Sequence, residues 1–247
     1  MLRICLPNLL PEENQITIPP DKVHYLRTVL RCKHGDQLLI FDGQGNCYRT
    51  SISTVTNREI KAVMIEKVSC DTESPLHIVL VQALLQREKM DFVVQKTTEL
   101  GIREVIPAVT TRSQIRTTRK TVRWKKVSED AARQSGRSVV PIIHNVMAFP
   151  EILHAVRDSA GLLFAVDTEM EVSLAVKTLK QKFQQNPGDD NRLYLLIGPE
   201  GGFTDDEMMM AHNKGFSLTS LGPRVLRAET AAISAVTLLQ FLLGDMN

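Results

Sequence analysis

The sequence predicts an α/β protein with a small β domain at residues 1–71 and a larger α/β domain at residues 72–247. Residues 1–71 contain several short apolar stretches separated by tight turns, which is typical of a small β-barrel. After Pro75, apolar strand-like segments alternate with amphipathic helix-like segments, which indicates a mostly parallel sheet flanked by helices. The polar segment 70–75 ends in proline and is the expected linker.

The composition supports a folded chain and argues against several classes of protein. The 247 residues are 43% hydrophobic and 23% charged, with a net charge of +2. These values are typical of a globular protein with a sizeable core rather than a disordered chain. No apolar run approaches the ~18 residues that cross a bilayer. Pro7, Asn8 and Pro11 interrupt any signal-peptide core, so we expect a cytoplasmic protein without a membrane segment.

Cysteine and histidine give no sign of a metal site. Cys5, Cys32, Cys47 and Cys70 are widely separated and form no Cys-x-x-Cys pair, so we expect small, buried thiols rather than a disulfide or a zinc centre. The six histidines are scattered. The sequence also lacks His-Glu-x-x-His, Gly-x-Ser-x-Gly, the P-loop and Gly-x-Gly-x-x-Gly, which disfavours metalloproteases, common hydrolases, P-loop enzymes and Rossmann dehydrogenases.

The elements of the first domain follow from short-range patterns. Strands are expected at residues 2–6, 36–42, 47–53 and 59–68. The glycine-rich turn at residues 43–46 joins the second and third of these strands, as in a β-hairpin. Residues 21–31 carry apolar side chains at helical spacing and predict one helix.

The elements of the second domain alternate along the chain. Strands are expected at residues 77–84, 104–110, 162–167, 193–197 and 216–220. Helices are expected at residues 90–100, 117–135, 172–183 and 230–243, with a further helix that starts after Thr204. Gly101 is the predicted stop of the first helix. Thr204 and Glu207 have the spacing of a capping box, and Gly215 ends the helix that they start.

Positive charge is concentrated in one stretch of this nearly neutral chain. Between Val105 and Ser128 there is no acidic residue, whereas seven residues are basic: Arg112, Arg116, Arg119, Lys120, Arg123, Lys125 and Lys126. On a helix, a narrow stripe would contain Arg119, Arg123, Lys126, Arg133 and Arg137. Such a patch can neutralise the phosphates of a nucleic acid, although a solvated helix face would have the same pattern. Trp124 is the only aromatic residue in the patch, so base stacking has little support.

Two glycine-bearing loops follow strands near the C-terminus. The first is Leu195-Leu-Ile-Gly-Pro-Glu-Gly-Gly-Phe-Thr204, and the second is Ser220-Leu-Gly-Pro-Arg-Val-Leu-Arg-Ala-Glu-Thr230. Glycine lets the backbone approach a ligand closely, and ligands of α/β sheets bind beyond the carboxyl ends of the strands. Each loop alone could be an ordinary turn, but together they predict a small-molecule cleft. Glu200 disfavours a nucleotide phosphate and favours a neutral or cationic ligand.

These motifs resemble the RsmE-type methyltransferases of the SPOUT superfamily over nearly the full chain. The most specific segments are Ile197-Gly-Pro-Glu-Gly-Gly202 and Leu221-Gly-Pro-Arg-Val-Leu-Arg-Ala-Glu-Thr-Ala231. Supporting segments are Gln95-Lys-Thr-Thr-Glu-Leu-Gly101, Arg112-Ser113, Gln134-Ser-Gly-Arg137 with Pro141, His24-Tyr-Leu-Arg-Thr-Val-Leu-Arg31 and Gly35-Asp36. Arg133 departs from the family, in which an acidic residue is expected before Gln134.

The resemblance implies both a fold and an activity. Residues 1–71 would form an RNA-binding PUA-like β-barrel, and residues 72–247 a SPOUT domain whose C-terminal segment is threaded as a trefoil knot. The family methylates N3 of a uridine in 16S ribosomal RNA with S-adenosylmethionine. The expected partners are this RNA within the small ribosomal subunit and a second copy of the chain, with no membrane and no metal.

The resemblance also assigns site residues. Those expected to bind S-adenosylmethionine in the knot are Leu196, Ile197, Gly198, Pro199, Gly201, Gly202, Leu221, Gly222, Val225 and Leu226. Together with the basic stretch described above, the resemblance gives the residues expected to bind RNA: Arg27, Arg31, Arg112, Arg116, Arg119, Arg123, Lys126 and Arg137. Uridine N3 must lose its proton or have its anion stabilised, so Arg227 and Glu229 are the catalytic candidates.

Three alternatives stay open at this level. Arg227 and Glu229 could form a pair that only shapes the loop. The chain could be a non-catalytic RNA-binding module with a degenerate cofactor pocket. It could also be an enzyme for another adenine nucleotide, which would need Arg224 or Arg227 to bind phosphate.

Overall fold

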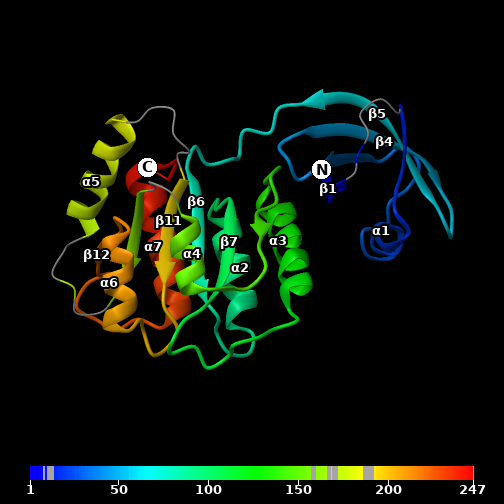
Figure 1. Cartoon of the computed structure of the whole chain (residues 1–247). Coiled ribbons are helices and arrows are strands. Elements are labelled where there is room, and N and C mark those ends of the chain that lie inside the picture. Colours follow the sequence, from blue (N-terminus) through cyan, green and yellow to red (C-terminus); the bar gives the residue numbers. More distant parts are fainter. Residues whose placement is uncertain are drawn as a thin grey trace. The chain divides into compact units, whose positions relative to one another are not determined.

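The computed structural model describes residues 1–7, 9, 14–156, 160–165, 168, 172–185 and 192–246. The chain divides into two compact units, which are both drawn in Figure 1. The first unit contains Met1–Glu73 and Ala132–Val140, and the second contains Ser74–Ala131 and Pro141–Asn247. The first unit therefore includes a segment from the middle of the chain, which the sequence patterns assigned to the second domain.

The first unit is built on a five-stranded sheet. The strand order is β1 (Leu2–Cys5), β3 (Gln37–Phe41), β4 (Cys47–Val55), β5 (Ile60–Val68) and β2 (Gln15–Thr17). β1 and β3 are parallel, and the other neighbours are antiparallel. The four predicted strands are present, and β2 was not predicted because it spans only three residues.

The predicted helix of the first unit is shorter and less regular than expected. The α-helix α1 covers Pro20–His24 and continues as a single π-helical stretch, η1, over Tyr25–Val29. Leu26 has no exposed surface and packs in the core with Leu38 and Ile40 of β3. Arg31 ends this region with a φ of 53°, a left-handed conformation that ends helical structure.

The segment Ala132–Val140 joins the first unit through several specific contacts. The Arg137 guanidinium donates to Glu73 Oε2 at 2.8 Å. The other carboxylate oxygen of Glu73 accepts hydrogen bonds from the amides of Ser138 and Val139. The Arg133 side chain donates to the Tyr25 hydroxyl at 3.0 Å. These contacts join residues that lie far apart in the sequence, so no local pattern could predict them.

The structure corrects the expectation for two of the four cysteines. Cys47 and Cys70 form a disulfide, with Cα atoms 6.4 Å apart, whereas Cys5 and Cys32 are buried thiols outside this disulfide. The register explains the pairing. Cys47 lies opposite Val68 in the β4–β5 ladder, so the chain beyond β5 brings Cys70 back to the same end. Sequence spacing alone does not reveal this antiparallel register.

The second unit contains the predicted α/β sheet. The strand order is β12 (Ser217–Thr219), β10 (Ala160–Phe164), β11 (Arg192–Ile197), β6 (His77–Ala83), β7 (Glu104–Val109) and β8 (Ile142–Ile143), with β9 (Met147–Ala148) also paired to β7. All of these pairs are parallel. Parallel pairing places the carboxyl ends of the strands at one edge of the sheet, as the sequence pattern predicts.

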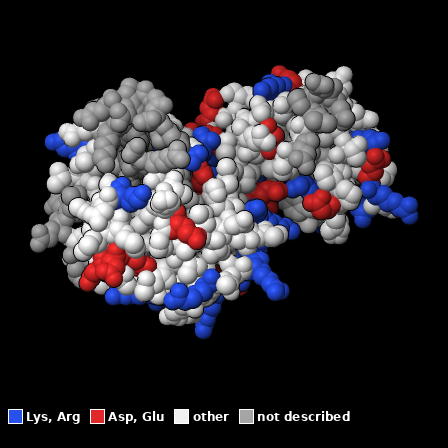
Figure 2. Space-filling view, viewed as in Figure 1, with Lys and Arg blue, Asp and Glu red and all other residues white. Residues whose placement is uncertain are grey.

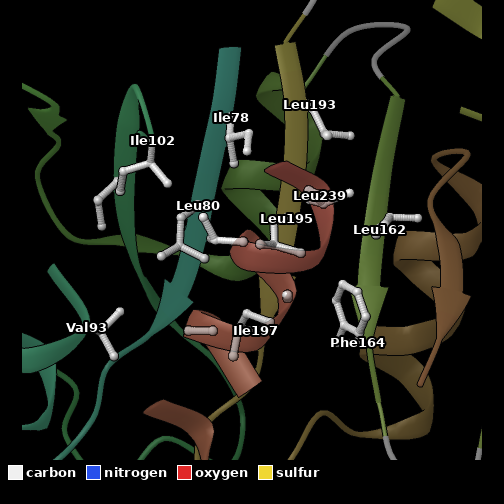
Figure 3. Close-up of a cluster of buried hydrophobic side chains, with 14 of the residues drawn as sticks. Ile78, Leu80, Val93, Ile102, Leu162, Phe164, Leu193, Leu195, Ile197 and Leu239 are labelled. Atoms are coloured by element: carbon white, nitrogen blue, oxygen red, sulfur yellow. The ribbon is translucent and has the colours of Figure 1, made fainter. Parts of the chain in front are cut away.

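Helices cover both faces of this sheet. The helices on one face are α2 (Lys89–Glu99), α3 (Thr121–Ser135), α5 (Val172–Gln185) and α7 (Ala228–Leu243), and those on the other are α4 (Phe149–Ala155) and α6 (Asp205–Asn213). Figure 3 shows Leu239 of α7 among the side chains of β6, β10 and β11. Trp124 is buried in this layer, in agreement with its place on the apolar face of the predicted helix.

Several boundaries differ from the sequence expectation. α3 begins at Thr121 rather than at residue 117, and α7 begins at Ala228 rather than at residue 230. β10 ends at Phe164, and residues 166–167, at which the predicted strand ends, lie outside the described residues. The short elements α4, β8 and β9 were not predicted.

Buried polar groups fix the end of α7 on the sheet. The Ser74 hydroxyl donates to Gln240 Oε1 at 2.7 Å, and Gln240 Nε2 donates to the carbonyl of Leu100 at 2.7 Å. Gly101 has a φ of +90°, and a Cβ there would lie 2.7 Å from the Gln240 amide. Gly101 therefore ends α2 as predicted and also makes room for Gln240.

In the part of the chain that the structure describes, no helix is long and apolar enough to span a membrane. The same residues contain no cluster of histidine, cysteine or acidic side chains suited to a metal ion.

Candidate functional site

A cavity lies where the strands β10, β11 and β12 end. Its volume is about 680 Å³, within the range of roughly 300–1,000 Å³ that is typical of small-molecule sites. The lining includes the strand ends at Phe164 and Ile197 and two loops, one after β11 and one after β12. Both glycine-bearing loops thus meet at one site, as the sequence predicts.

The first loop, residues 198–203, depends on glycine for its shape. A Cβ on Gly198 would lie 3.2 Å from the Phe203 ring and 3.3 Å from the backbone of Gly202. Gly202 has a φ of +68°, a conformation that favours glycine. The loop then enters α6 through the predicted capping box, in which the Thr204 amide donates to Glu207 Oε2 at 2.9 Å.

The loop after β7 holds the first loop in place. The Arg112 guanidinium donates to the carbonyls of Gly201 and Phe203 at 2.8 and 3.1 Å. The Thr111 amide donates to Glu207 Oε1 at 2.7 Å, and the Glu207 side chain is almost fully buried. Arg112, expected to bind RNA, therefore also binds the backbone of the cavity loop.

The second loop, residues 221–226, forms the opposite wall. Gly222 has a φ of +97° and open space around its Cα. Val225 is 78% exposed although it is apolar, and it lines the cavity beside Leu226. An apolar side chain kept at the surface of a cavity is available to contact a ligand.

Nine of the ten residues predicted to bind the cofactor line this cavity. They are Ile197, Gly198, Pro199, Gly201, Gly202, Leu221, Gly222, Val225 and Leu226. Leu196 is the exception. It is fully buried in the core on the α4–α6 side of the sheet, because alternate residues of a strand point to opposite faces. The expected contact of its side chain with a ligand is therefore wrong.

The lining of the cavity combines apolar surface with two acidic and two basic residues, the basic ones being Arg112 and Arg224. Ile197, Leu221 and Leu226 offer apolar surface, while Glu200 and Asp205 add carboxylates. Burial alone would raise the pKa of Glu200, but hydrogen bonds from Lys89 and from backbone amides lower it below its usual value. Glu200 is therefore negatively charged at neutral pH.

A second, more open cavity of about 530 Å³ lies beside α2 and the start of α7. It is lined by Arg87, Glu88, Lys89, Phe92 and Glu229. Lys89 Nζ lies 2.7 Å from Glu200 Oε1 and 3.7 Å from Glu229 Oε2. No local sequence pattern indicates a role for Lys89, because its partners lie more than a hundred residues away.

The two catalytic candidates lie at the start of α7 but do not pair with each other. Arg227 is exposed and precedes the first residue of α7, and among the described residues it forms no ion pair with Glu229. Glu229 faces Lys89 instead, and its Oε2 is buried without a hydrogen bond from any described residue. The described residues therefore show no contact that would support the alternative in which Arg227 and Glu229 form a pair that only shapes the loop.

The basic stretch is largely exposed. Arg116, Arg119, Arg123, Lys125 and Lys126 all lie at the surface. Arg123 is engaged by Asp91 at 2.6 Å, and Asp91 also accepts from the Trp124 indole. In Figure 2, Lys and Arg side chains project from the lower edge, at which Figure 1 shows the parallel strands ending.

Three other predicted RNA contacts lie in the first unit, and one of them needs correction. Arg31 is exposed, and Arg27 donates to the Asn57 side chain at 2.7 Å. The Arg137 side chain is only 2% exposed and pairs with Glu73. A buried, paired guanidinium has no free surface for a phosphate, so the expectation of an RNA contact is wrong for Arg137.

Comparisons with known proteins agree with this fold and site. A family model described as RNA methyltransferase domain matches residues 72–240, and one described as RNA methyltransferase PUA domain matches residues 18–65. The larger match covers the whole cavity. The fold and the site therefore define an RNA methyltransferase with a PUA domain.

Individual relatives narrow this class. The ribosomal RNA small subunit methyltransferase E of Buchnera aphidicola subsp. Acyrthosiphon pisum is 32% identical, with 91% of this chain and 87% of the relative covered. The enzyme of the same name from Neisseria gonorrhoeae, solved bound to S-adenosyl methionine, is 28% identical with a TM-score of 0.89 and full coverage of both chains. A Legionella pneumophila methyltransferase, solved with its cofactor SAM, is 30% identical with a TM-score of 0.86 and 99% coverage of both. The chain belongs to the ribosomal RNA small subunit methyltransferase E family.

Proposed function

We propose that this protein transfers a methyl group from S-adenosylmethionine to N3 of a uridine in the 16S RNA of the small ribosomal subunit. The observation that carries the proposal is the cavity at the ends of β10, β11 and β12, walled by both glycine-bearing loops. Relatives of the same fold were solved with this cofactor, and the family match includes this part of the chain.

The cavity residues suit the chemical parts of the cofactor. Ile197, Leu221 and Leu226 would pack against the adenine ring, and backbone groups of the two loops would bind its polar edge. Glu200 and Asp205 would favour the positively charged end of the molecule. When bound, S-adenosylmethionine supplies an activated methyl group on a sulfonium, so the protein mainly has to align the acceptor and exclude water.

The acceptor nitrogen carries a proton that must leave before or during transfer. Glu229 presents a buried oxygen without a hydrogen bond from a described residue, so it can accept the N3 proton. The guanidinium of Arg227, two residues earlier, would stabilise the negative charge of the uridine or bind its phosphate. Both side chains lie at the start of α7, directly after the loop that walls the cavity.

The proposal extends to the finer architecture and the partners. The first unit would act as an RNA-binding PUA-like β-barrel, and the C-terminal segment of the second unit would be threaded as a trefoil knot. The protein acts as a homodimer in the cytoplasm, without a metal. The exposed residues Arg116, Arg119 and Lys126 support an RNA surface, because exposed cations release counterions from a nucleic acid when they bind its phosphates.

Mass spectrometry of ribosomal RNA from cells that lack this protein tests the proposal. We expect one N3-methyluridine to disappear from 16S RNA, to return with the wild-type protein, and to stay absent with Glu229→Gln. An unchanged modification in the deletion strain would contradict the proposal. Binding of 16S RNA without any methylation would instead support the non-catalytic RNA-binding module.

A further inference from the structure

Lys89 connects three segments that lie far apart in the chain. It is the first residue of α2, and its ammonium group lies 2.7 Å from Glu200 in the first cavity loop. It also lies 3.7 Å from Glu229, the second residue of α7, the helix that follows the second loop. One side chain therefore contacts both the loop that follows β11 and the helix that follows the second loop.

The charges at this point favour a fixed arrangement. The hydrogen bond to Glu200 raises the pKa of Lys89 above its usual value, and Glu200 has a lowered pKa. Lys89 and Glu200 therefore carry opposite charges at neutral pH. Arg227 acts against the ammonium by charge repulsion, so the carboxylates of Glu200 and Glu229 are the groups that hold Lys89 in place.

The bridge also links the residues of the two cavities. Glu200 lines the cavity assigned to the cofactor, whereas Lys89 and Glu229 line the second cavity with Arg87 and Phe92. The proposed proton acceptor and the cofactor loop are therefore joined by a single cation. Removal of that cation would leave two carboxylates facing each other across the junction, which is unfavourable.

We propose that Lys89 is a positioning residue for methyl transfer, because its ammonium group holds the loop of Glu200 and the start of α7 at a fixed spacing. The part of this inference that concerns catalysis rests on the proposed function. Loops that are ordered before the ligand arrives bind more tightly, since less conformational entropy is lost on binding. Lys89 therefore acts through Glu200 and Glu229 rather than on the substrate itself.

Hydrogen–deuterium exchange of the cofactor-free protein tests the structural part. We expect Lys89→Met to speed exchange several-fold at residues 199–203 and 226–230, without a change in β6 or β11. Calorimetric titration with S-adenosylmethionine should then show about tenfold weaker binding. In steady state the KM for the cofactor should rise about tenfold, with a smaller change in kcat.

Lys96→Met is the matched control. Lys96 lies on the same helix, with its side chain 35% exposed against 34% for Lys89, and it pairs with Glu99 at 2.9 Å. Its partner lies on α2 itself, so this substitution should leave exchange and cofactor binding within twofold of wild type. Lys89→Arg should restore binding to within about twofold, because it keeps the charge.

A double-mutant cycle tests whether Lys89 acts through its contact with Glu200. Glu200→Gln should also speed exchange at residues 199–203 of the cofactor-free protein, and the double variant should exchange no faster there than Lys89→Met alone, because both changes break one bridge. Wild-type exchange and binding in Lys89→Met would overturn the inference, and so would faster exchange across the whole sheet. If wild type itself fails to bind the cofactor, the proposed function fails, while the exchange data still decide whether Lys89 orders the loops.

Discussion

Arg137 shows how one residue can satisfy a motif and still have a different role from the one that the motif suggests. Its side chain is 2% exposed, and it neutralises Glu73 inside the first unit. Burial alone would raise the pKa of Glu73, but the hydrogen bonds and charge of Arg137 and two backbone amides lower it. The pair therefore stabilises the packing of residue 73 against the segment Ala132–Val140.

Removal of this guanidinium should destabilise the protein strongly. Arg137→Met leaves the Glu73 carboxylate partly buried without its cation, a situation that typically costs about 3–5 kcal/mol. Urea unfolding followed by circular dichroism would measure the change. Arg119→Met, at an exposed position, is the control and should stay within about 0.5 kcal/mol of wild type. Equal stability of the two variants would contradict the structural role of Arg137.

Residues whose role depends on backbone shape were predictable from the sequence, whereas those that depend on distant partners were not. Gly198, Gly202 and Gly222 lie where loops need glycine, and the sequence marks such positions directly. Lys89 has the same local pattern as any lysine near the start of a helix. Its role comes from Glu200 and Glu229, which only the folded chain brings close to it.

At the scale of elements, α3 combines a buried apolar face with an exposed basic one. Trp124 and Ala131 are buried, and Lys126 lies at the surface, as the helical spacing predicts, whereas the exposed Arg119 precedes the first residue of α3. Arg123 differs from its neighbours because Asp91 of α2 already binds it. The positive charge of this face is therefore partly neutralised within the protein, which the sequence pattern does not show.

Charge reversal at Arg119, which precedes α3, and at Lys126 of α3 should weaken RNA binding in proportion to the number of phosphates that these side chains neutralise. Arg119→Glu with Lys126→Glu should lower both the affinity for 16S RNA and its salt dependence, by about one unit of slope for each phosphate that is no longer neutralised. Arg123→Glu should have a smaller effect on affinity. Filter binding at several salt concentrations would measure this. Lys177→Glu, at an exposed position of α5, should leave the slope unchanged. An unchanged slope in the double variant of Arg119 and Lys126 would show that these side chains are only solvated.

Glu104 is the first residue of β7 and lies at the edge of the parallel sheet opposite the cavity. Its carboxylate connects side chains near the starts of neighbouring strands. Its carboxylate bonds His144 Nε2 at 2.6 Å and His77 Nε2 at 2.7 Å, and Arg192 lies 3.4 Å away. The hydrogen bond from His144, with that of His77 and the charge of Arg192, lowers the pKa of Glu104 to about 2 despite its burial. This group therefore stabilises the second unit only while it is ionised.

The stability of the second unit should fall in acid because of Glu104. A folded pKa of about 2 lies below the unfolded value of 4.5, so the contribution is complete above pH 4.5 and is lost as the pH falls toward 2. The loss should be on the order of 2–3 kcal/mol. Urea unfolding between pH 6 and pH 2.5 would measure it, and Glu104→Gln should flatten this part of the profile. If the stability of Glu104→Gln fell in acid as steeply as that of wild type, the assignment to Glu104 would be contradicted.

At the scale of the whole molecule, periodicity predicted the alternation of strands and helices but not the way in which the chain returns on itself. The strands of the parallel sheet, the capping box at Thr204 and both cavity loops follow from local patterns. The transfer of Ala132–Val140 to the first unit and the disulfide of Cys47 with Cys70 depend on long-range pairing. Strand order and register are set by tertiary contacts that the local sequence does not encode.

A crystal structure of the protein soaked in S-adenosylmethionine tests the central claim most directly. We predict the cofactor in the cavity of β10, β11 and β12, against Gly198, Gly202 and Gly222, with its methyl group directed toward Glu229. A cavity closed by its own side chains, such as Val225 and Leu226, with no bound cofactor, would contradict the account.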